Sequence, residues 1–294
     1  MIKQHVTSLV FFLAVLVIYD VSYAQKTDKH LDQSMHALAD GFHGSIGWYV
    51  LNLKNNKGSF YNADTIFPTA SIIKVPILAG IMKKMEDGEL DYHQKLVYKD
   101  SLLYAGEDIL GSFKSDETIE LGKVIMLMLT TSDNTASLWL QSLSGTGTAI
   151  NSLMQDLGLE HTRVNSRTTG RQSDWQMYGW GQTTPKEMAT LFSMIAGGKA
   201  ISKKASDKML KLLSRNYWDE HALNAIPPGT FVASKNGAVD ASRSEVLFVN
   251  AKGTPYLFSA FTKQNEDRSW NSSNEAWQLT EKLSDLVWRH FNGK

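Results

Sequence analysis

The sequence predicts an α/β fold of the α+β type, with a five-stranded antiparallel sheet flanked by helices and an inserted all-helical lobe. Two observations indicate this fold. Residues near both ends of the chain alternate between apolar and polar, as strands do, whereas the residues between them repeat with helical periodicity. Strands so far apart form one sheet only if the two ends of the chain come together. We therefore expect a single domain over 25–294, with an α/β lobe at 25–66 and 215–294 and a helical lobe at 67–214.

The N-terminal part of the α/β lobe predicts one helix and two strands. Leu31, Met35 and Leu38 recur at helical spacing within residues 27–40. Alternation then predicts a strand at 45–53, a turn at the Asn-Asn-Lys-Gly sequence that follows it, and a short strand at 59–62.

The helical lobe is expected to contain six helices, one of which has an especially clear start. Thr184 is a good N-cap, Pro185 suits the first helical position, and Glu187 completes a capping box. Residues 119–129 are apolar on nearly every side and therefore predict a buried central helix. The six expected helices span 71–86, 119–129, 134–143, 148–157, 184–197 and 203–214.

The last part of the chain returns to strand patterning. Strands are predicted at 230–234, 245–250 and 256–261, and the Lys-Gly-Thr-Pro sequence between the last two favours a hairpin turn. Residues 274–291 then have helical periodicity, with Trp277 among the residues expected to face inward. These three strands and the two near the N-terminus make the five strands of the expected sheet.

The first 24 residues are typical of a secretory signal peptide. Lys3 is followed by a mostly apolar stretch from Val6 to Tyr19, and the segment ends in a small-x-small pattern at Ala24. We expect cleavage near Ala24, which predicts a secreted or periplasmic protein without a stable membrane anchor. The alternative is an uncleaved N-terminal anchor.

Composition excludes several kinds of chemistry. The 294 residues include no Cys, which excludes disulfides, a thiolate nucleophile and cysteine-ligated metal centres. Lys and Arg number 30 and Asp and Glu number 30, without a long basic run, so no nucleic-acid partner is expected. The histidines lack metal-ligand spacing, and Gly145-Thr146-Gly147 lacks the third glycine of a dinucleotide loop. We therefore expect no cofactor and no metal.

A serine followed three residues later by a lysine suggests nucleophilic catalysis. Ser71 and Lys74 are three residues apart, so a helix places the ammonium on the same face as the hydroxyl. A serine needs a neighbouring base to attack an acyl carbon, and lysine is available where no catalytic histidine stands out. The alternative is an ordinary Ser and Lys on one surface turn.

Two further strings have chemical potential, and each also has a structural interpretation. Ser132-Asp133-Asn134 lies between two expected helices, where it would also serve as an N-cap. Lys235-Asn236-Gly237 lies at the end of an expected strand, where it would also form a turn. Gly237 would allow another backbone or a ligand to approach closely.

Taken in this order, the three strings resemble those of the penicillin-recognising serine enzymes, and most closely the class A β-lactamases. That family carries Ser-x-x-Lys, Ser-Asp-Asn and Lys-Thr/Ser-Gly at similar separations, and the resemblance covers essentially the whole chain after residue 24. The flanking sequences Phe67-Pro68-Thr69-Ala70 and Phe231-Val232-Ala233 are similar as well. The resemblance implies a β-lactamase/transpeptidase-like fold and a serine hydrolase.

The resemblance also implies roles for particular residues. Ser71 would be acylated, Lys74 would take its proton, and Ser132 would relay a proton to the leaving nitrogen. Asn134 would hold Lys74 and the substrate amide. Lys235 would bias Ser132 and attract the substrate carboxylate.

Residues after Lys235 would complete the substrate site. The backbone N–H groups of Ser71 and Ala238 would form the oxyanion hole. Asn236 replaces the family's usual hydroxyl residue, which would alter one hydrogen bond to the substrate carboxylate. Arg243 lies near the place of a carboxylate-binding arginine in some members; its alternative role is that of an ordinary surface arginine at the start of a strand.

The sequence departs from the family at the residue that activates the deacylating water. In class A enzymes a glutamate lies six residues after a Thr-Arg pair; here the pair is Thr162-Arg163 and the sixth residue is Thr168. Asp174 is the only acid between the pair and Pro185. Aromatic residues in this loop, among them Trp175 and Trp180, would either anchor the loop or line a different substrate pocket.

Three functions therefore stay open. The first is a serine hydrolase that opens β-lactams, with water activated by Asp174, Lys74 or another group. The second is a D,D-peptidase or esterase that acts on a peptidoglycan-like peptide. The third is a penicillin-binding protein that is acylated and deacylates slowly. In each case the expected partner is a small molecule and the expected state is a monomer.

Overall fold

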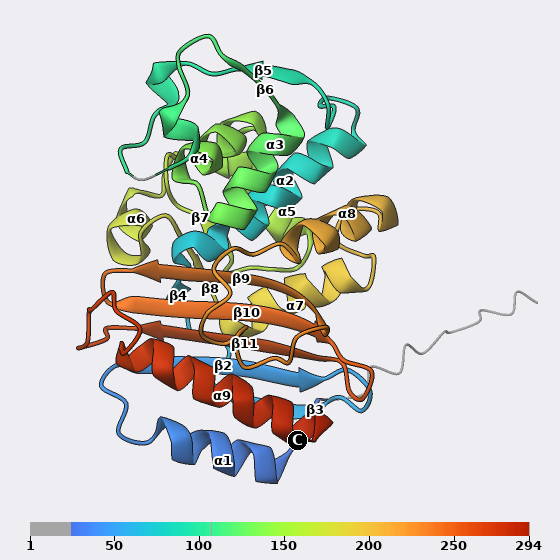
Figure 1. Ribbon diagram of the computed structural model, residues 1–294, viewed down its shortest axis with the longest axis vertical. Coiled ribbons are helices and arrows are strands. Elements are labelled where there is room, and N and C mark those ends of the chain that lie inside the picture. The colour runs from blue at the N-terminus through green and yellow to red at the C-terminus, as the bar shows by residue number, and fades with distance from the viewer. Residues whose placement is uncertain (1–24, 107, 294) are drawn as a thin grey trace, which may run out of the picture.

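The computed structural model describes residues 25–106 and 108–293, and the expected signal peptide at 1–24 lies outside them (Figure 1). The α-helices of the described residues are α1 (Lys29–Ala39), α2 (Lys74–Glu86), α3 (Leu121–Met126), α4 (Asn134–Leu143), α5 (Thr146–Asp156), α6 (Gln172–Tyr178), α7 (Pro185–Ala196), α8 (Lys203–Leu213) and α9 (Glu275–Asn292). The strands are β1 (Lys26–Thr27), β2 (Ser45–Asn52), β3 (Lys57–Tyr61), β4 (Phe67–Pro68), β5 (Lys95–Val97), β6 (Thr118–Glu120), β7 (Arg163–Val164), β8 (Gly181–Thr183), β9 (Phe231–Val239), β10 (Ser242–Asn250) and β11 (Tyr256–Lys263). The 3₁₀ turns are η1 (Ala70–Ile73), η2 (Asp100–Leu102) and η3 (Leu110–Ser112), and η4 (Leu127–Thr131) is a π-helix.

The main sheet has the strand order β1-β3-β2-β11-β10-β9. Strand β2 pairs with β11 along its whole length, from Ser45 opposite Lys263 to Asn52 opposite Tyr256. This pairing brings the two ends of the chain together, as the five-stranded antiparallel prediction requires. The structure adds the two-residue strand β1, which pairs with β3 in parallel.

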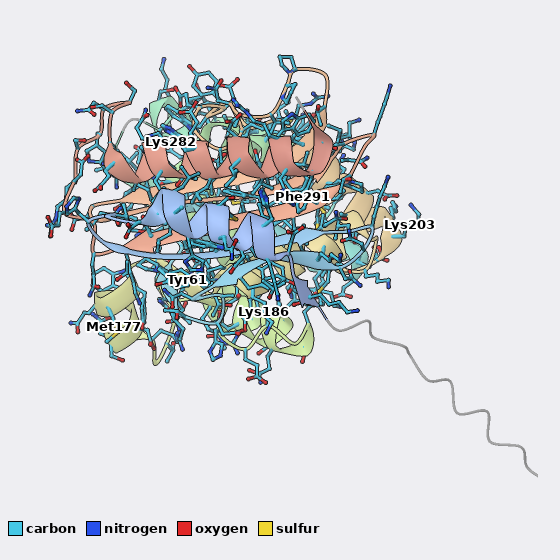
Figure 2. The ribbon with its side chains drawn as sticks, turned by 90° about the horizontal axis from the view of Figure 1, so that it is seen from below. Tyr61, Met177, Lys186, Lys203, Lys282 and Phe291 are labelled. Carbon is cyan, nitrogen blue, oxygen red and sulfur yellow. The ribbon has the colours of Figure 1, made fainter. Side chains whose placement is uncertain are left out.

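Helices α1 and α9 lie side by side on one face of the main sheet (Figures 1 and 2). Leu31 and Leu283 are fully buried with Trp48, Leu247 and Phe258 of the sheet, so the two helices and this face share an apolar core. Alternation along the strands sends these side chains to this face and their sequence neighbours to the other face.

The opposite face of the sheet packs against α7 and the turn η1. The apolar core on this side continues into the helical part of the chain, where α2 is the central helix and α4, α5 and α8 pack around it. Residues Lys74 to Met82 of α2 are all buried. No helix among the described residues is long and apolar enough to cross a membrane.

The structure differs from the sequence prediction at three elements. The expected helix 119–129 begins inside β6 and ends as the π-helix η4, and α2 takes the central place instead. The expected strand 230–234 continues to Val239 because β10 pairs with it as far as Ser242 opposite Val239. The loop between Arg163 and Pro185 contains the short helix α6, and β8 joins β4 and β7 in a small sheet.

Candidate active site

Ser71 lies in the 3₁₀ turn η1, immediately before α2 and beneath the edge strand β9. The preceding residue, Ala70, has a φ of 43°, in the left-handed region that non-glycine residues rarely adopt. Thr69 donates its N–H to the carbonyl of Gly181 on β8, at 2.9 Å, and so fixes the start of the turn. Such local strain is concentrated at functional sites, where the surrounding structure holds it in place.

Lys74 is the centre of a hydrogen-bond network that joins η1 to the segment before α4. Its Nζ lies 3.0 Å from Ser71 Oγ, 3.0 Å from Ser132 Oγ and 2.9 Å from Asn134 Oδ1. The carbonyl of Ser132 also accepts a hydrogen bond from Nζ. The structure therefore brings together four of the residues that the sequence singled out.

The surroundings of Lys74 favour its neutral amine. The side chain is fully buried, and loss of solvation lowers the pKa of Lys74 well below its ordinary value. The positive charge of Lys235 lowers the pKa further, while Asp108 and Asp133 act in the opposite direction. A neutral amine 3.0 Å from a serine hydroxyl can accept its proton.

The helix ends around Ser132 set the position of its hydroxyl. The π-helix η4 ends at Ser132, whose φ of 63° reverses the chain direction. Asp133 then caps α4 by accepting the N–H of Ala136 at 2.8 Å. Its other carboxylate oxygen accepts the N–H of Leu110 at 2.8 Å, which ties this turn to the preceding loop. Ser132 is thus held between two helix ends.

Lys235 is fully buried on β9, and burial lowers its pKa to about 7. Its Nζ donates to the carbonyl of Asn236 at 2.9 Å and to Asn236 Oδ1 at 3.2 Å. Among the described residues no hydrogen bond joins Lys235 to Ser132. The contact between the two that the family resemblance implies is therefore absent from this arrangement.

Gly237 allows β9 to lie directly on η1. A Cβ at Gly237 would come 2.6 Å from the carbonyl oxygen of Thr69 and 3.0 Å from the backbone nitrogen of Ser71. The expectation of a close backbone approach at this glycine is met by the geometry. It brings the backbone of β9 at Gly237 next to the N–H of Ser71.

The structure does not bring Arg243 to this cluster, so the carboxylate-binding role that the resemblance implies is corrected. On β10 it alternates with Val246, whose cross-strand partner is Lys235, and so faces the other side of the sheet. Its guanidinium donates to the carbonyls of Asp240, Ser242 and Ser269 at 2.8–2.9 Å and lies over the ring of Trp270. The Arg243 side chain is fully buried, so it is not the ordinary surface arginine of the alternative interpretation either.

Thr168 and Asp174, the two loop residues considered for the deacylation step, also lie apart from the network. Thr168 donates its hydroxyl to the carbonyl of Ser166 at 2.9 Å, and its oxygen lies against Gly147 on α5. Asp174 lies on α6 and pairs with Arg171 at 3.4 Å. Among the described residues, no loop carboxylate contacts Ser71 or Lys74.

Sequence reasoning missed three contributors near the network. Asp108 accepts the N–H of Thr135 at 2.8 Å and adds negative charge near Lys74. Trp218 donates its indole N–H to the carbonyl of Thr131 at 3.0 Å, beside Ser132. Glu245 is fully buried on β10, on the face of the sheet opposite Lys235, and its negative charge raises the pKa of Lys235. No local motif marks these residues, although an acid inside an apolar strand was a visible signal for Glu245.

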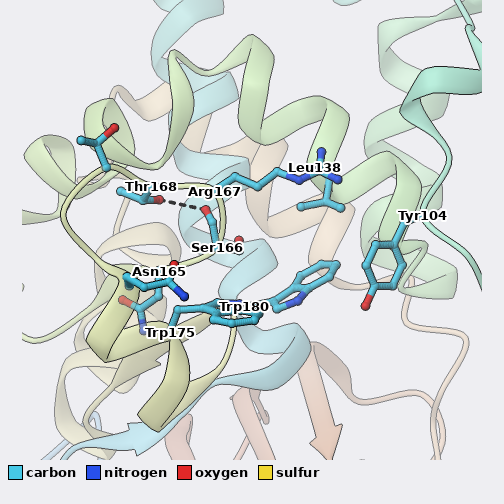
Figure 3. Close-up of a pocket in the computed structure, with 10 residues that line it drawn as sticks. Tyr104, Leu138, Asn165, Ser166, Arg167, Thr168, Trp175 and Trp180 are labelled. Carbon is cyan, nitrogen blue, oxygen red and sulfur yellow. Dashed lines mark hydrogen bonds between the residues drawn. The ribbon is translucent and has the colours of Figure 1, made fainter.

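A pocket of about 530 Å³ opens beside the network rather than over Ser71 (Figure 3). Its residues come from the loop before η3, from α4, and from the segment between β7 and β8. They are Tyr104, Leu138, Asn165, Ser166, Arg167, Thr168, Thr169, Gln172, Trp175 and Trp180. Aromatic residues of the loop therefore line a pocket, which was one of the two predicted roles.

Comparisons with known proteins agree with this geometry. The sequence model of the beta-lactamase enzyme family matches residues 30–291. The chain is 24% identical over 275 residues to beta-lactamase PSE-4 of Pseudomonas aeruginosa, which covers 90% of this chain and 93% of the relative. It is 25% identical over 256 residues to an imipenem-hydrolyzing beta-lactamase of Enterobacter cloacae, which covers 83% and 85%. An acyl-enzyme complex of a PBP-A mutant with penicillin G superposes with a TM-score of 0.81 at 24% identity, covering 92% of this chain and 99% of that one.

Proposed function

The chain belongs to the beta-lactamase enzyme family, and from this membership we propose that it opens β-lactam rings through an acyl-enzyme on Ser71. The family match and the similar proteins indicate a serine hydrolase of the class A β-lactamase type. We further propose that the protein is exported after cleavage near Ala24 and acts as a monomer. The observation that carries the proposal is the buried Lys74 amine within hydrogen-bond distance of both Ser71 and Ser132.

Acylation follows from the hydrogen bonds of Lys74. The neutral amine accepts the proton of the Ser71 hydroxyl as Oγ forms a bond to the lactam carbonyl carbon. The resulting ammonium passes a proton through Ser132 to the lactam nitrogen as the C–N bond breaks. Lys74 Nζ is 3.0 Å from each of the two hydroxyls, and the second transfer is completed when the Ser132 hydroxyl donates to the lactam nitrogen. Asn134 supports the ammonium that forms between the two transfers.

The developing oxyanion and the substrate carboxylate need separate partners. The N–H groups of Ser71 and Ala238 would bind the oxyanion, since Gly237 lets the two backbones approach closely. Lys235 would attract the carboxylate of the substrate with help from Asn236. Arg243 has no part in this proposal.

Hydrolysis of the acyl-enzyme is proposed to be the slow step. Removal of a general base typically slows its step by about 10²–10⁴-fold. No loop carboxylate among the described residues contacts the network, so Lys74 is the base that remains for the attacking water. After acylation it must be neutral again to take a proton from that water.

The absence of a loop carboxylate from the described network also favours a second candidate function. A protein without a deacylating carboxylate would behave as a penicillin-binding protein, or as a D,D-peptidase or esterase whose natural acyl group leaves more readily. The superposition on PBP-A, a mutant of which forms an acyl-enzyme complex with penicillin G, supports this second candidate.

One experiment separates the candidates. Purified protein is mixed with a chromogenic cephalosporin, and turnover and intact mass are recorded together. We expect a one-to-one adduct that persists for many seconds and a low rate of turnover. Rapid turnover without an adduct would contradict slow deacylation. If neither an adduct nor turnover is observed, the β-lactam proposal is contradicted and an esterase or peptidase is favoured.

A further inference from the structure

The pocket of Figure 3 adjoins the catalytic network through three of its walls. Leu138 lies one turn after Asn134 on α4, so both side chains point along the same face of the helix. Tyr104 donates its backbone N–H to Thr135, the residue after Asn134, at 3.1 Å. Trp180 precedes Gly181, whose carbonyl holds the start of η1. A group attached to an acyl carbon on Ser71 would therefore extend toward this pocket.

Four of the ten described lining residues are aromatic or apolar: Tyr104, Leu138, Trp175 and Trp180. Tyr104 and Trp180 pack edge to face, with ring centroids 5.0 Å apart and an angle of 86° between the rings. Trp175 on α6 is 43% exposed although it lines the pocket. Leu138 adds an aliphatic surface opposite the rings (Figure 3). Such walls suit a planar ring of the ligand.

Arg167 adds a positive charge to the pocket. Its side chain reaches across the opening toward Leu138 in Figure 3, and its backbone has a φ of 48°. A left-handed backbone at a residue other than glycine is costly, so the surrounding loop must hold it in place. The residue lies next to Thr168, the position at which the family resemblance implies a glutamate.

The described lining residues contain no acid to balance this charge. Two carboxylates lie in neighbouring segments, and of these only Asp174 is paired with a cation. Asp108 accepts hydrogen bonds from the N–H and hydroxyl of Thr135, and Asp174 pairs with Arg171. Among the described lining residues Arg167 is thus the one charged side chain, next to the position at which a class A enzyme would hold a glutamate.

We propose that this pocket selects acyl side chains that carry both a ring and an anionic group, with Arg167 binding the anion. The inference rests on the proposed function, since it names the substrate class of that site. The ring lies against Tyr104, Leu138 and Trp180, and the carboxylate or sulfonate pairs with the guanidinium. A side chain with a cationic group is disfavoured by the same charge.

Three penicillins that differ at one atom position test the proposal. Benzylpenicillin carries hydrogen on its benzylic carbon, carbenicillin carries a carboxylate there, and ampicillin carries an ammonium. The second-order rate constant of acylation is measured for each by intact mass. We expect carbenicillin to react about tenfold faster than ampicillin, equivalent to about 1.4 kcal/mol, with benzylpenicillin between them.

Arg167→Gln removes the charge and keeps a side chain of similar reach. We expect the ratio of the acylation rate constants for carbenicillin and ampicillin, both measured on this variant, to fall to about one. Arg289→Gln is the matched control, because Arg289 loses the same charge on α9, where it pairs with Asp285 on the far side of the sheet. Equal rates for the three penicillins, or a preference that survives Arg167→Gln, would overturn the inference.

Equilibrium binding to the Ser71→Ala protein separates this inference from the proposed function. If the unchanged protein is never acylated but Ser71→Ala binds carbenicillin more tightly than ampicillin in an Arg167-dependent way, only the proposed function is contradicted. If acylation occurs without such a preference in rate or binding, only the inference about Arg167 is contradicted.

Discussion

Lys74 shows how a single residue acquires its chemistry from its position. An exposed lysine is protonated at neutral pH, but full burial and the nearby charge of Lys235 lower the pKa of Lys74. Three side chains, those of Ser71, Ser132 and Asn134, are within 3.0 Å of its Nζ. The spacing of Ser71 and Lys74 predicted their proximity, whereas the burial that alters the pKa comes from packing far along the chain.

The first prediction concerns the nucleophile. Ser71→Ala removes the hydroxyl that is proposed to attack, so acylation by benzylpenicillin should fall below detection in intact mass spectra. Ser273→Ala, which alters an exposed serine before α9, is the control and should be acylated normally. An adduct that persists in Ser71→Ala would show that another residue is the nucleophile.

The second prediction concerns the pH dependence of acylation. Burial lowers the pKa of Lys235 to about 7, so its positive charge is present below this pH and is lost as the pH rises through it. Acylation by an anionic β-lactam should therefore decline above pH 7. Lys235→Arg should remove this decline, because arginine keeps its charge throughout the range.

The measurement for this prediction is the second-order rate constant of acylation between pH 5 and 10. A decline that occurs at the same pH in Lys235→Arg would assign it to another group. The structure makes this prediction possible, since the sequence alone does not indicate how deeply Lys235 is buried.

At the scale of elements, β9 and η1 depend on each other at Gly237. The sequence placed this glycine at the end of a strand, whereas β9 continues through it and lies on the backbone of η1. Helix and strand existence followed from periodicity. The lengthening of β9 and the π-helix η4 could not be predicted from periodicity, because they depend on pairing with β10 and on packing beside α4.

The third prediction tests this contact. Gly237→Ala places a Cβ 2.6 Å from the Thr69 carbonyl, so either β9 or η1 must move. We expect a loss of about 1–3 kcal/mol in the free energy of unfolding and a larger proportional loss of acylation. Urea unfolding and acylation rates measure the two effects.

Gly111→Ala serves as the comparison, because its added Cβ meets only the flexible end of Leu103 closely. If Gly237→Ala acylates at the normal rate and unfolds at the normal urea concentration, the close approach of β9 to η1 is wrong.

At the scale of the whole molecule, the main sheet separates the catalytic face from a second buried cluster. Glu245 lies on the far face, where its carboxylate accepts the N–H groups of Ala222 and Leu223 at 2.9 and 3.2 Å. This segment continues from Trp218, whose indole donates to Thr131 beside Ser132. The carboxylate thus anchors a connection that reaches the catalytic side.

The fourth prediction follows from the burial of Glu245, which raises its pKa to about 8. The folded protein holds this proton between the ordinary pKa near 4.5 and about 8, whereas the unfolded chain releases it. Glu245 therefore lowers the stability of the fold as the pH rises through this window. Relative to the unchanged protein, Glu245→Gln should become more stable as the pH rises from 5 to 8.

Urea unfolding at several pH values measures this difference. A constant difference for Glu245→Gln would indicate that the buried carboxylate is charged throughout the window.

The whole fold was more predictable than the site. The α/β class, the joined chain ends and the family followed from patterning and from three short strings. The placement of Arg243 could not be predicted in this way, because one residue of register decides which face of β10 it occupies. The pocket beside α4 also depends on loop conformation, for which Arg167 and Trp180 gave no periodic signal.

The central claim is that Ser71 forms an acyl-enzyme that hydrolyses slowly. The most direct measurement is a time course of intact mass with benzylpenicillin in slight excess, followed by peptide mapping of the adduct. We expect nearly complete modification by one penicillin per chain, located on the peptide that contains Ser71, and slow return to the original mass. A chain that stays unmodified whether or not the penicillin is consumed, or an adduct located elsewhere, would contradict the claim.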